Sequence, residues 1–391
     1  MDRSKWEYKK LGEVAQYPKN RLGSEFLDID NYVGVENLLK DKGGRINALS
    51  LPTNTSTIEY KENDILIGNI RPYLKKIWFA DRHGGASGDV VNIRVKENYR
   101  DRINPKFLYC VLSTDAFFTF DMAHSKGAKM PRGNKDEIVK YSIPLPPVAD
   151  QQRIVAELDC LNEMIALKQE QLKEFDKLAQ SIFYDMFGDP VTNEKGWNVI
   201  ELGTKCEVTS FKRVLIEDVV DSGVPFIRGT ELMALSKATK GEKIEFTLFI
   251  TAEHYAQVKA ISGVPAVGDL LIPSINSEGN IWILDTDEPR YYKDGRVLWV
   301  HVNHDAYTSE ALKFIMHILL KKTYSVMATG ATFAELKLFV LRELNTILPP
   351  LALQQQFAEK IQAIEAQKEL VKQSIAETQQ LLDSRMDYYF D

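Results

Sequence analysis

The chain has 391 residues, of which 44% are hydrophobic and 27% charged, and its formal net charge is −6. This composition is typical of a globular protein, and no apolar run is long enough to predict a membrane-spanning helix. The length allows two or three domains. The three cysteines (Cys110, Cys160 and Cys206) lack metal-site spacing, which favours reduced thiols in a cytoplasmic protein.

Charge is distributed unevenly along the chain. Residues 1–145 hold 24 Lys+Arg against 19 Asp+Glu, a net charge of +5. Residues 146–189 carry −5, and residues 190–348 and 349–391 carry −3 each. Because partners meet the charge of a domain rather than of a whole chain, the basic first segment is compatible with nucleic-acid binding.

In the first segment, short β-type runs are separated by turn residues. They predict strands near 32–35, 64–67, 76–80 and 89–95. A helix is expected from Pro105 to about Phe118, with proline in its first turn. Residues 125–135 form a basic, glycine-containing stretch that predicts a loop.

One stretch occurs twice, because residues 144–188 and 347–391 align without a gap at an offset of 203 positions. The matched residues are Pro146-Pro147 with Pro349-Pro350, Ala149 with Ala352, Gln151-Gln152 with Gln354-Gln355, and Phe187 with Phe390. An internal sequence repeat indicates a repeated structural unit, so it decides how the whole fold is interpreted. The two long segments are therefore expected to be two copies of one domain.

Each copy of the repeat predicts a long helix with one apolar seam, since apolar residues alternate at spacings of four and three. The seam residues are Ile154, Leu158, Leu161, Ile165, Leu172 and Phe175 in the first copy, and Phe357, Ile361, Ile364, Val371, Ile375 and Leu382 in the second. Each helix could pack on its own domain. Pairing with each other buries both seams at once, and a two-fold relation between the repeats would make the pair antiparallel.

The second segment repeats landmarks of the first. The motif Trp6-x4-Leu11-Gly12 recurs as Trp197-x4-Leu202-Gly203. The strand predicted after Asp64 corresponds to one predicted after Asp269. The residues between the landmarks differ freely. The chain is thus expected to be α/β (α+β), with one fold built twice that carries two different surfaces.

No motif for catalysis or nucleotide binding is present in the sequence, which lacks both GxxxxGK[ST] and HExxH. The one histidine pair, His301-x-x-His304, predicts the end of a surface strand better than a metal site. We therefore expect neither a catalytic residue nor a metal ligand in this chain.

Taken together, the two variable segments, each followed by PLPPVADQQ or ILPPLALQQ and a long heptad helix, resemble the specificity subunit of type I restriction–modification systems. The paired Trp-x4-Leu-Gly motif and residues 64–76 also match that family's target-recognition domains. The resemblance implies target-recognition domains at 1–145 and 190–348, and spacer helices at 146–189 and 349–391. It implies mixed β-sheets, a pseudo-two-fold repeat and an antiparallel coiled coil.

The resemblance also implies a function. Each domain would read one half of a bipartite site in double-stranded DNA, while the helices set the spacing and dock two modification (methyltransferase) subunits. Two restriction (translocase/nuclease) subunits would complete the complex in a bacterial or archaeal cytoplasm. S-adenosylmethionine, ATP and Mg²⁺ would be bound by these partners, and no cofactor by this chain.

DNA contacts require cations for phosphates and polar side chains for base edges. In the first domain the candidates are Arg71, Tyr73, Lys75, Lys76, Lys126, Lys129, Arg132, Asn134 and Lys135. In the second they are Arg228, Ser274, Asn276, Ser277, Asn280, Lys321, Lys322, Thr329 and Thr332. The second domain lacks the Arg-Pro-Tyr-Leu-Lys-Lys element of the first.

Two other functions stay open at the level of the sequence. A self-contained DNA methyltransferase or endonuclease would need a cofactor loop or a carboxylate cluster. A coiled-coil scaffold with two protein-binding heads would show no salt-dependent affinity for DNA.

Overall fold

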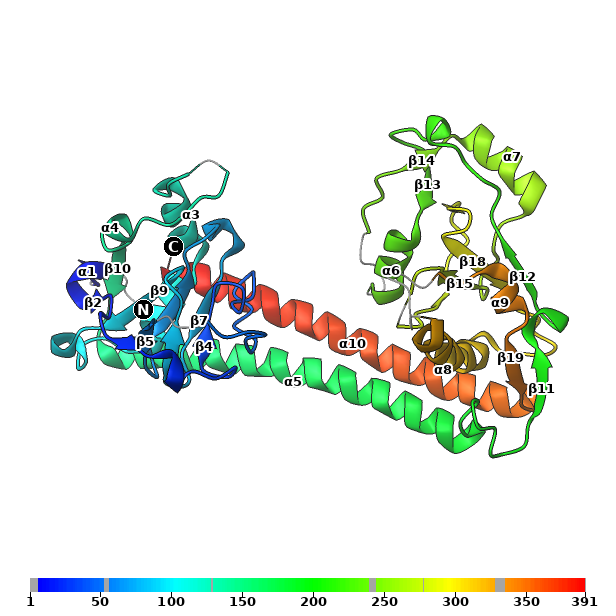
Figure 1. Ribbon diagram of the computed structural model, residues 1–391, viewed down its shortest axis with the longest axis horizontal. Coiled ribbons are helices and arrows are strands. Elements are labelled where there is room, and N and C mark those ends of the chain that lie inside the picture. Colours follow the sequence, from blue (N-terminus) through cyan, green and yellow to red (C-terminus); the bar gives the residue numbers. More distant parts are fainter. Residues whose placement is uncertain are drawn as a thin grey trace. The chain divides into compact units, whose positions relative to one another are not determined.

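The computed structural model describes residues 6–52, 56–127, 129–238, 244–276, 278–327 and 335–390. It divides into two compact units, one made of Met1–Leu167 with Ile375–Asp391 and the other of Lys168–Ser374 (Figure 1). Each unit therefore joins one long segment to part of each long helix. The predicted boundaries after residues 145, 189 and 348 follow the repeat instead of the contacts, and they stay a prediction.

Three sheets and a set of short helices make up the first unit, before the long helix α5 (Val148–Phe187) begins. The strands are β1 (Glu7–Lys10), β2 (Ala15–Gln16), β3 (Arg21–Leu22), β4 (Tyr32–Val33), β5 (Thr57–Tyr60), β6 (Ile65–Gly68), β7 (Ile77–Phe79), β8 (Gly84–Ala86), β9 (Val90–Val95) and β10 (Ser142–Leu145). The helices are α1 (Leu11–Val14), α2 (Pro105–Leu112), α3 (Asp115–Ala123) and α4 (Lys135–Ile138), with a 3₁₀ turn η3 at Pro72–Leu74.

The second unit has the same kinds of element and ends in the helix α10 (Leu351–Phe390). Its strands are β11 (Asn198–Glu201), β12 (Glu207–Ser210), β13 (Val224–Ile227), β14 (Phe249–Ile250), β15 (Leu270–Pro273), β16 (Trp282–Ile283), β17 (Tyr291–Tyr292), β18 (Val297–His301) and β19 (Asn345–Leu348). Its helices are α6 (Gly229–Lys237), α7 (Ala252–Ser262), α8 (Ser309–Met327) and α9 (Leu338–Arg342). Among the described helices of the whole chain, none is long and apolar enough to cross a membrane.

Most of the sheet topology is shared by the two units, although the third sheet has four strands in the first unit and three in the second. A four-stranded sheet of order β2-β9-β6-β7 in the first matches β12-β18-β15-β16 in the second. The pair β1-β10 matches β11-β19, and the parallel pair β4-β8 matches β13-β17. The sheets are mixed and the fold is built twice, so the predicted fold class is confirmed.

The helix predicted from Pro105 to Phe118 is wrong, because the structure divides it into α2 and α3. Thr114 has an extended backbone (φ −71°, ψ 154°), and its side chain accepts a hydrogen bond from the backbone N–H of Phe117. It is thus the N-cap of a new helix, as threonine often is. At the same offset of 203, the second unit has His317, which lies inside the uninterrupted α8.

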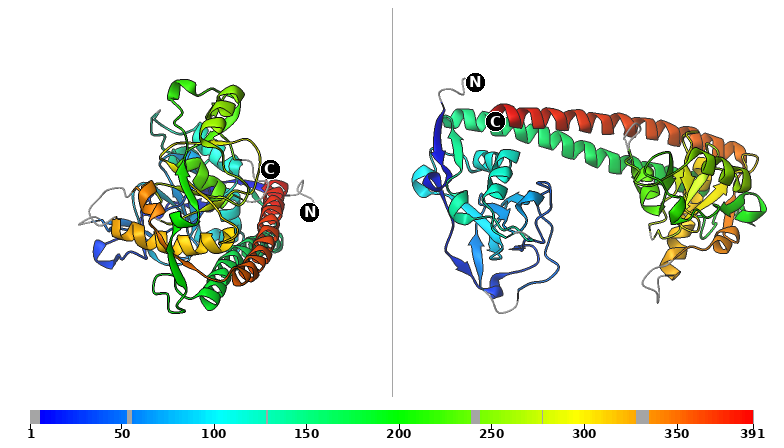
Figure 2. Two further views of the ribbon diagram at one scale, coloured as in Figure 1. Left: turned by 90° about the vertical axis from the view of Figure 1, so that its right-hand side faces the viewer. Right: turned by 90° about the horizontal axis from the view of Figure 1, so that it is seen from above.

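Within each unit, segments of α5 and α10 run antiparallel and side by side, as Figures 1 and 2 both show. In the first unit, the hydroxyl of Tyr389 donates to Glu157. In the second, Lys168 Nζ donates to the carbonyl of Ser374 at 3.2 Å. As the residue number rises along α5, the number of the residue that it contacts on α10 falls. This is the pattern of an antiparallel pair.

The predicted seam residues lie between the helices and their own unit's core. Eight are buried: Ile154, Leu158, Leu161, Ile165, Phe357, Ile361, Ile364 and Leu382. Four are partly buried: Leu172, Phe175, Val371 and Ile375. Burial is therefore deepest where each helix also touches a β-sheet domain.

Polar residues interrupt the seam and form cross-helix interactions. Lys368 Nζ lies 2.8 Å from Asp176 of α5 and 2.9 Å from Glu365 of its own helix. A polar residue in a seam specifies register, because a slipped pair would leave its charge unpaired.

A buried glutamine fixes the beginning of each long helix to its domain. Gln151 Nε2 donates to the carbonyls of Arg102 and Pro146, and Gln151 Oε1 accepts from the N–H of Asn104 at 2.8 Å. Gln354 makes the equivalent bonds to Ala306, Pro349 and Thr308. Both side chains are fully buried. This explains why the first Gln of each Gln-Gln pair recurs in the repeat.

We predict that Gln354→Leu lowers the free energy of unfolding by about 3 kcal/mol, because two carbonyls and one N–H lose their partner in a buried place. Denaturant unfolding of the full chain measures the change. The neighbouring Gln355 is exposed, so Gln355→Leu is the matched control and should change stability by less than about 0.5 kcal/mol. Equal effects of the two variants would contradict the anchoring role.

Candidate nucleic-acid interface

In the first unit, the two predicted DNA-contact clusters lie against each other. Ile70 and Arg132 form an antiparallel bridge. The N–H of Arg71 donates to the carbonyl of Pro131 at 2.7 Å, and the N–H of Gly133 donates to the carbonyl of Asn69 at 2.9 Å. Residues 69–76 and 126–135 therefore form one continuous surface, called here the basic surface.

Three cations of the basic surface are exposed and have no side-chain hydrogen bond or ion pair with any described residue: Arg71, Lys126 and Lys129. Tyr73, beside Arg71 on η3, is 49% exposed. Both Arg71 and Lys75, which flank η3, adopt left-handed backbone conformations (φ 54° and 49°). The turn thus projects Arg71 and Tyr73 outward at a backbone cost that ordinary turns avoid.

The other candidates of the basic surface already have protein partners. Lys75 Nζ lies 2.7 Å from Asp115, and Arg132 lies 3.2 Å from Asp89. Lys76 Nζ donates to the carbonyl of Val35 at 2.7 Å, and burial lowers the pKa of its ammonium group. These residues are better placed to hold the loops than to bind phosphates.

Asn134 and Lys135 also serve the local structure. Asn134 is the N-cap of α4 and accepts from the N–H of Asp136. The backbone carbonyl of Lys135 accepts from the hydroxyl of Tyr17 at 2.9 Å. Contact with DNA by any member of the first-unit set stays a prediction.

In the second unit, two of the candidates that follow β15 are buried. Ser274 is fully buried, and Asn276 is 4% exposed. Asn276 is bonded to the backbone N–H and carbonyl of Asn280. Ser274 and Asn276 therefore cannot reach a base in this conformation.

The remaining second-unit candidates are divided between paired and exposed residues. Arg228 forms an ion pair with Glu231 next to the start of α6. Lys321 and Lys322 are exposed on α8. Ser277, Thr329 and Thr332 lie outside the described residues.

An inverted ion pair distinguishes the two units at one equivalent position. Arg132 pairs with Asp89 in the first unit, and Arg296 pairs with Glu335 at 3.3 Å in the second. Arg132 and Glu335 are 203 residues apart, and each precedes a residue whose N–H bonds to the end of a central strand. The shared framework thus presents opposite charges at the same place.

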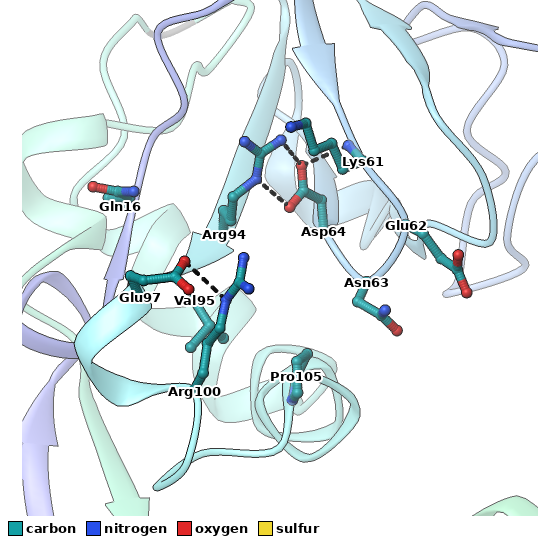
Figure 3. A pocket seen from close by; sticks show the side chains of 10 residues that line it. All are labelled: Gln16, Lys61, Glu62, Asn63, Asp64, Arg94, Val95, Glu97, Arg100 and Pro105. Carbon is teal, nitrogen blue, oxygen red and sulfur yellow. Dashed lines mark hydrogen bonds and ion pairs between the residues drawn. The ribbon is translucent and has the colours of Figure 1, made fainter.

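A buried carboxylate at the start of the central strand was not predicted from the sequence. In the first unit, Asp64 is 1% exposed and accepts two hydrogen bonds of 2.7 Å from Arg94. It also accepts from Asn92 at 3.1 Å and from the N–H of Lys61 at 2.9 Å. Figure 3 shows the Arg94 guanidinium and the Asp64 carboxylate facing each other.

Asp269 has the same role in the second unit. It accepts from Trp299 Nε1 at 2.8 Å and from the N–H of Ala266 at 2.9 Å, and it lies 3.0 Å from His301 Nδ1. The sequence does carry the signal, since both aspartates directly precede a buried strand in aligned landmarks. His301 therefore pairs with a carboxylate, and among the described residues no three ligand side chains gather to hold a metal.

A polar pocket of about 590 Å³ lies beside Asp64 (Figure 3). Its cations and carboxylates are largely matched, because Arg94 pairs with Asp64 and Arg100 lies 3.0 Å from Glu97. The pocket contains no histidine or cysteine among its lining residues. We therefore assign it no catalytic chemistry.

Beneath the basic surface lies a buried aspartate without a hydrogen-bond donor. Asp121 is 1% exposed, and neither of its carboxylate oxygens has a hydrogen-bond partner; the same holds for Oδ1 of Asn69. A Cβ placed on Gly133 would lie 2.7 Å from Asp121 Oδ1 and 2.8 Å from Asn69 Oδ1. Burial raises the pKa of Asp121 to about 6, against a small opposing effect of His124.

In the second unit, the equivalent position holds Tyr324. Its hydroxyl lies 3.2 Å from the carbonyl of Ser274 and 3.3 Å from that of Pro273, and donates to them. A hydroxyl always has a proton to donate, whereas a carboxylate has none once it is ionised. At pH values above the pKa of Asp121, this position therefore stabilises the first unit less than Tyr324 stabilises the second.

We predict that Asp121→Asn stabilises the protein at pH 8 and not at pH 4. Between about pH 4 and pH 6 the folded chain keeps a proton that the unfolded chain has released, so the free energy of unfolding falls as the pH rises through this window. A shift of two pKa units corresponds to about 3 kcal/mol, which is the upper limit of the gain. Thermal unfolding at both pH values measures it.

The exposed Asp136 provides the control, since Asp136→Asn should leave the pH dependence of stability unchanged. A gain for Asp121→Asn of the same size at pH 4 and pH 8 would contradict the assignment.

Comparisons with known proteins agree with the fold. A family model described as the type I restriction modification DNA specificity domain matches residues 3–176. The MjaVIII specificity subunit of a type I restriction enzyme from Methanocaldococcus jannaschii is 24% identical over 388 residues, covering 92% of this chain and 86% of that protein. A putative type I specificity subunit from Haemophilus influenzae is 25% identical over 297 residues, covering 75% of this chain and 72% of that protein.

Two solved structures share the fold. The S subunit of a type I system from M. genitalium superposes with a TM-score of 0.53 at 14% identity, covering 97% of this chain and 95% of that one. A chain from a study of complex assembly and conformational transition in a type I system gives a TM-score of 0.57 at 21% identity, covering 98% and 97%. Residues 3–176 thus match the type I restriction modification DNA specificity domain, and most of the chain is similar in sequence to type I specificity subunits, whose fold it shares.

Proposed function

We propose that this chain reads a bipartite DNA sequence for a type I restriction–modification complex, with one part of the site read by each unit. One observation carries the proposal: the same sheet framework is built twice and bears different loops at the same place. The first unit has the outward turn at Arg71–Lys76, and the sequence of the second has no such basic element between the corresponding strands β15 and β16. Two domains with the same framework and different surface loops are compatible with a DNA site that has two different halves.

The chemistry of modification and cleavage belongs to partner subunits in this proposal. S-adenosylmethionine, ATP and Mg²⁺ would be bound there, in the cytoplasm of a bacterium or archaeon. The two alternatives, a self-contained DNA enzyme and a coiled-coil scaffold, are less well supported, because the relatives reported above are specificity subunits.

Two equivalent docking places for modification subunits are supported by leucines that point away from the seam. Leu167 on α5 is 72% exposed, and Leu370, 203 residues later on α10, is 60% exposed. Leu178 and Leu381 repeat the relation at 47% and 50%. Exposed apolar side chains at repeated positions on acidic helices suit two copies of one protein partner. Native mass spectrometry of the co-purified complex tests this stoichiometry.

We predict that replacing Arg71, Lys126 and Lys129 by alanine weakens DNA binding by the assembled complex and flattens its salt dependence. Each phosphate contact contributes about 0.9 to the slope of log K against log salt, so the slope should fall by up to about 3. Fluorescence anisotropy across a salt series measures it.

A charge-matched control removes Lys61, Arg100 and Arg102, of which Arg100 and Arg102 pair with Glu97 and Glu7. It should leave the slope almost unchanged. An equal loss of slope in both triple variants would mean that net charge, rather than the basic surface, governs binding.

We predict that removing one heptad from each helix, residues 168–174 and 368–374, shortens the spacer of the methylated sequence. Seven residues of helix span about 10 Å, which corresponds to about three base pairs. The two segments face each other, since Lys168 bonds to Ser374. Sequencing of methylated adenines in cells that express the complex measures both half-sites and the spacer.

Deleting residues 168–174 alone is the control, because it shifts the seam out of register and should prevent a working complex. Altered half-sites with an unaltered spacer in the double deletion would overturn the spacing role of the helices.

A further inference from the structure

A basic stripe on α8 faces a pocket in the second unit. Lys313, His317 and Lys321 are four residues apart and so lie on one face of the helix. All three line a pocket of about 420 Å³, together with residues of α5, α6, α10 and the loop before β16. The volume is large enough for a small polar ligand.

The carboxylates of this pocket already serve another lysine. Asp176 and Glu365 lie 2.8 Å and 2.9 Å from Lys368 Nζ. Lys313 has no hydrogen bond or ion pair with any described residue, although burial lowers the pKa of its ammonium group. A cation removed from water needs an anion close by to offset its lost hydration. Glu365, Glu310 and Asp176 lie close enough to oppose the fall in the pKa of Lys313, but no described carboxylate lies within ion-pair distance of it.

His317 and Lys321 lie at the same pocket. His317 Nδ1 lies 2.9 Å from the carbonyl of Gly279 and donates to it, which fixes the imidazole ring. Lys321 is exposed, one turn further along α8. Asn280 lines the pocket as well and offers an amide for hydrogen bonding.

The basic stripe is not part of the shared framework. At the same offset of 203, the first unit has Cys110, Thr114 and Phe118. Neither Lys313 nor Lys321 has an ion pair with a described residue, so no salt bridge of α8 requires these two lysines. A stripe that neither the framework nor the helix requires is explained by a ligand.

We propose that this pocket binds a phosphate group through Lys313 and Lys321, with His317 and Asn280 at its rim. A phosphate supplies the missing counter-ion and accepts several hydrogen bonds at once. The group could belong to the DNA backbone or to a free nucleotide. For DNA the inference rests on the proposed function, because the Asn276–Asn280 loop borders the pocket.

The test titrates the full chain with inorganic phosphate, ADP and a short DNA duplex at constant ionic strength. Isothermal calorimetry measures binding, with chloride as the reference salt. Lys313→Met keeps most of the side-chain volume and should weaken phosphate binding at least tenfold, and Lys313→Arg should restore most of it. Lys259→Met removes an exposed lysine on α7 that does not line the pocket, and it should have no effect.

Competition between the probes distinguishes the two sources. Displacement of phosphate by the duplex identifies the DNA backbone, and tighter binding of ADP than of phosphate identifies a nucleotide. The proposal is overturned if phosphate does not bind, or if it binds Lys313→Met as tightly as Lys259→Met. A chain that binds phosphate at Lys313 while its assembled complex shows no sequence-specific methylation would contradict the proposed function alone.

Discussion

The seam between α5 and α10 is the constraint on which the rest of the structure depends. Each helix is 40 residues long and carries an apolar stripe that its own domain covers only near one end. The core of the first unit includes Leu158 from α5 and Leu382 from α10, and that of the second includes Phe183 and Phe357. Neither unit completes its core without residues from both helices, so the last 17 residues of the chain stabilise the first unit.

The paired helices and the buried glutamines make a common frame, and the recognition surfaces differ on it. Gln151 and Gln354 make the same three hydrogen bonds, and Asp64 and Asp269 both fix the start of a central strand. The loops, in contrast, differ between the two units. Arg132 is replaced by Glu335, and Asp121 by Tyr324. The frame and the loops can therefore vary separately, as the proposed reading of two unlike half-sites requires.

Each unit contains a buried ionisable group without a hydrogen bond or ion pair to any described residue. In the first unit this group is Asp121, whose pKa is raised by burial. In the second it is Lys313, whose pKa is lowered by burial although Glu365, Glu310 and Asp176 oppose the shift. The aspartate is enclosed, whereas the lysine lines an open pocket. Only the lysine is therefore positioned to take a ligand from outside.

The sequence by itself determined the duplication, the fold class, both long helices and the central strands β6, β9 and β15, because these depend on periodicity and on residues close in the chain. It also placed the basic loops correctly along the chain. It missed the break at Thr114, where one capping side chain outweighs a helical pattern. Only the tertiary structure decided which candidates are free: Arg71 projects outward, Lys76 bonds to Val35, and Ser274 is buried. Burial and ion pairing join residues far apart in the chain, so no local pattern could have separated them.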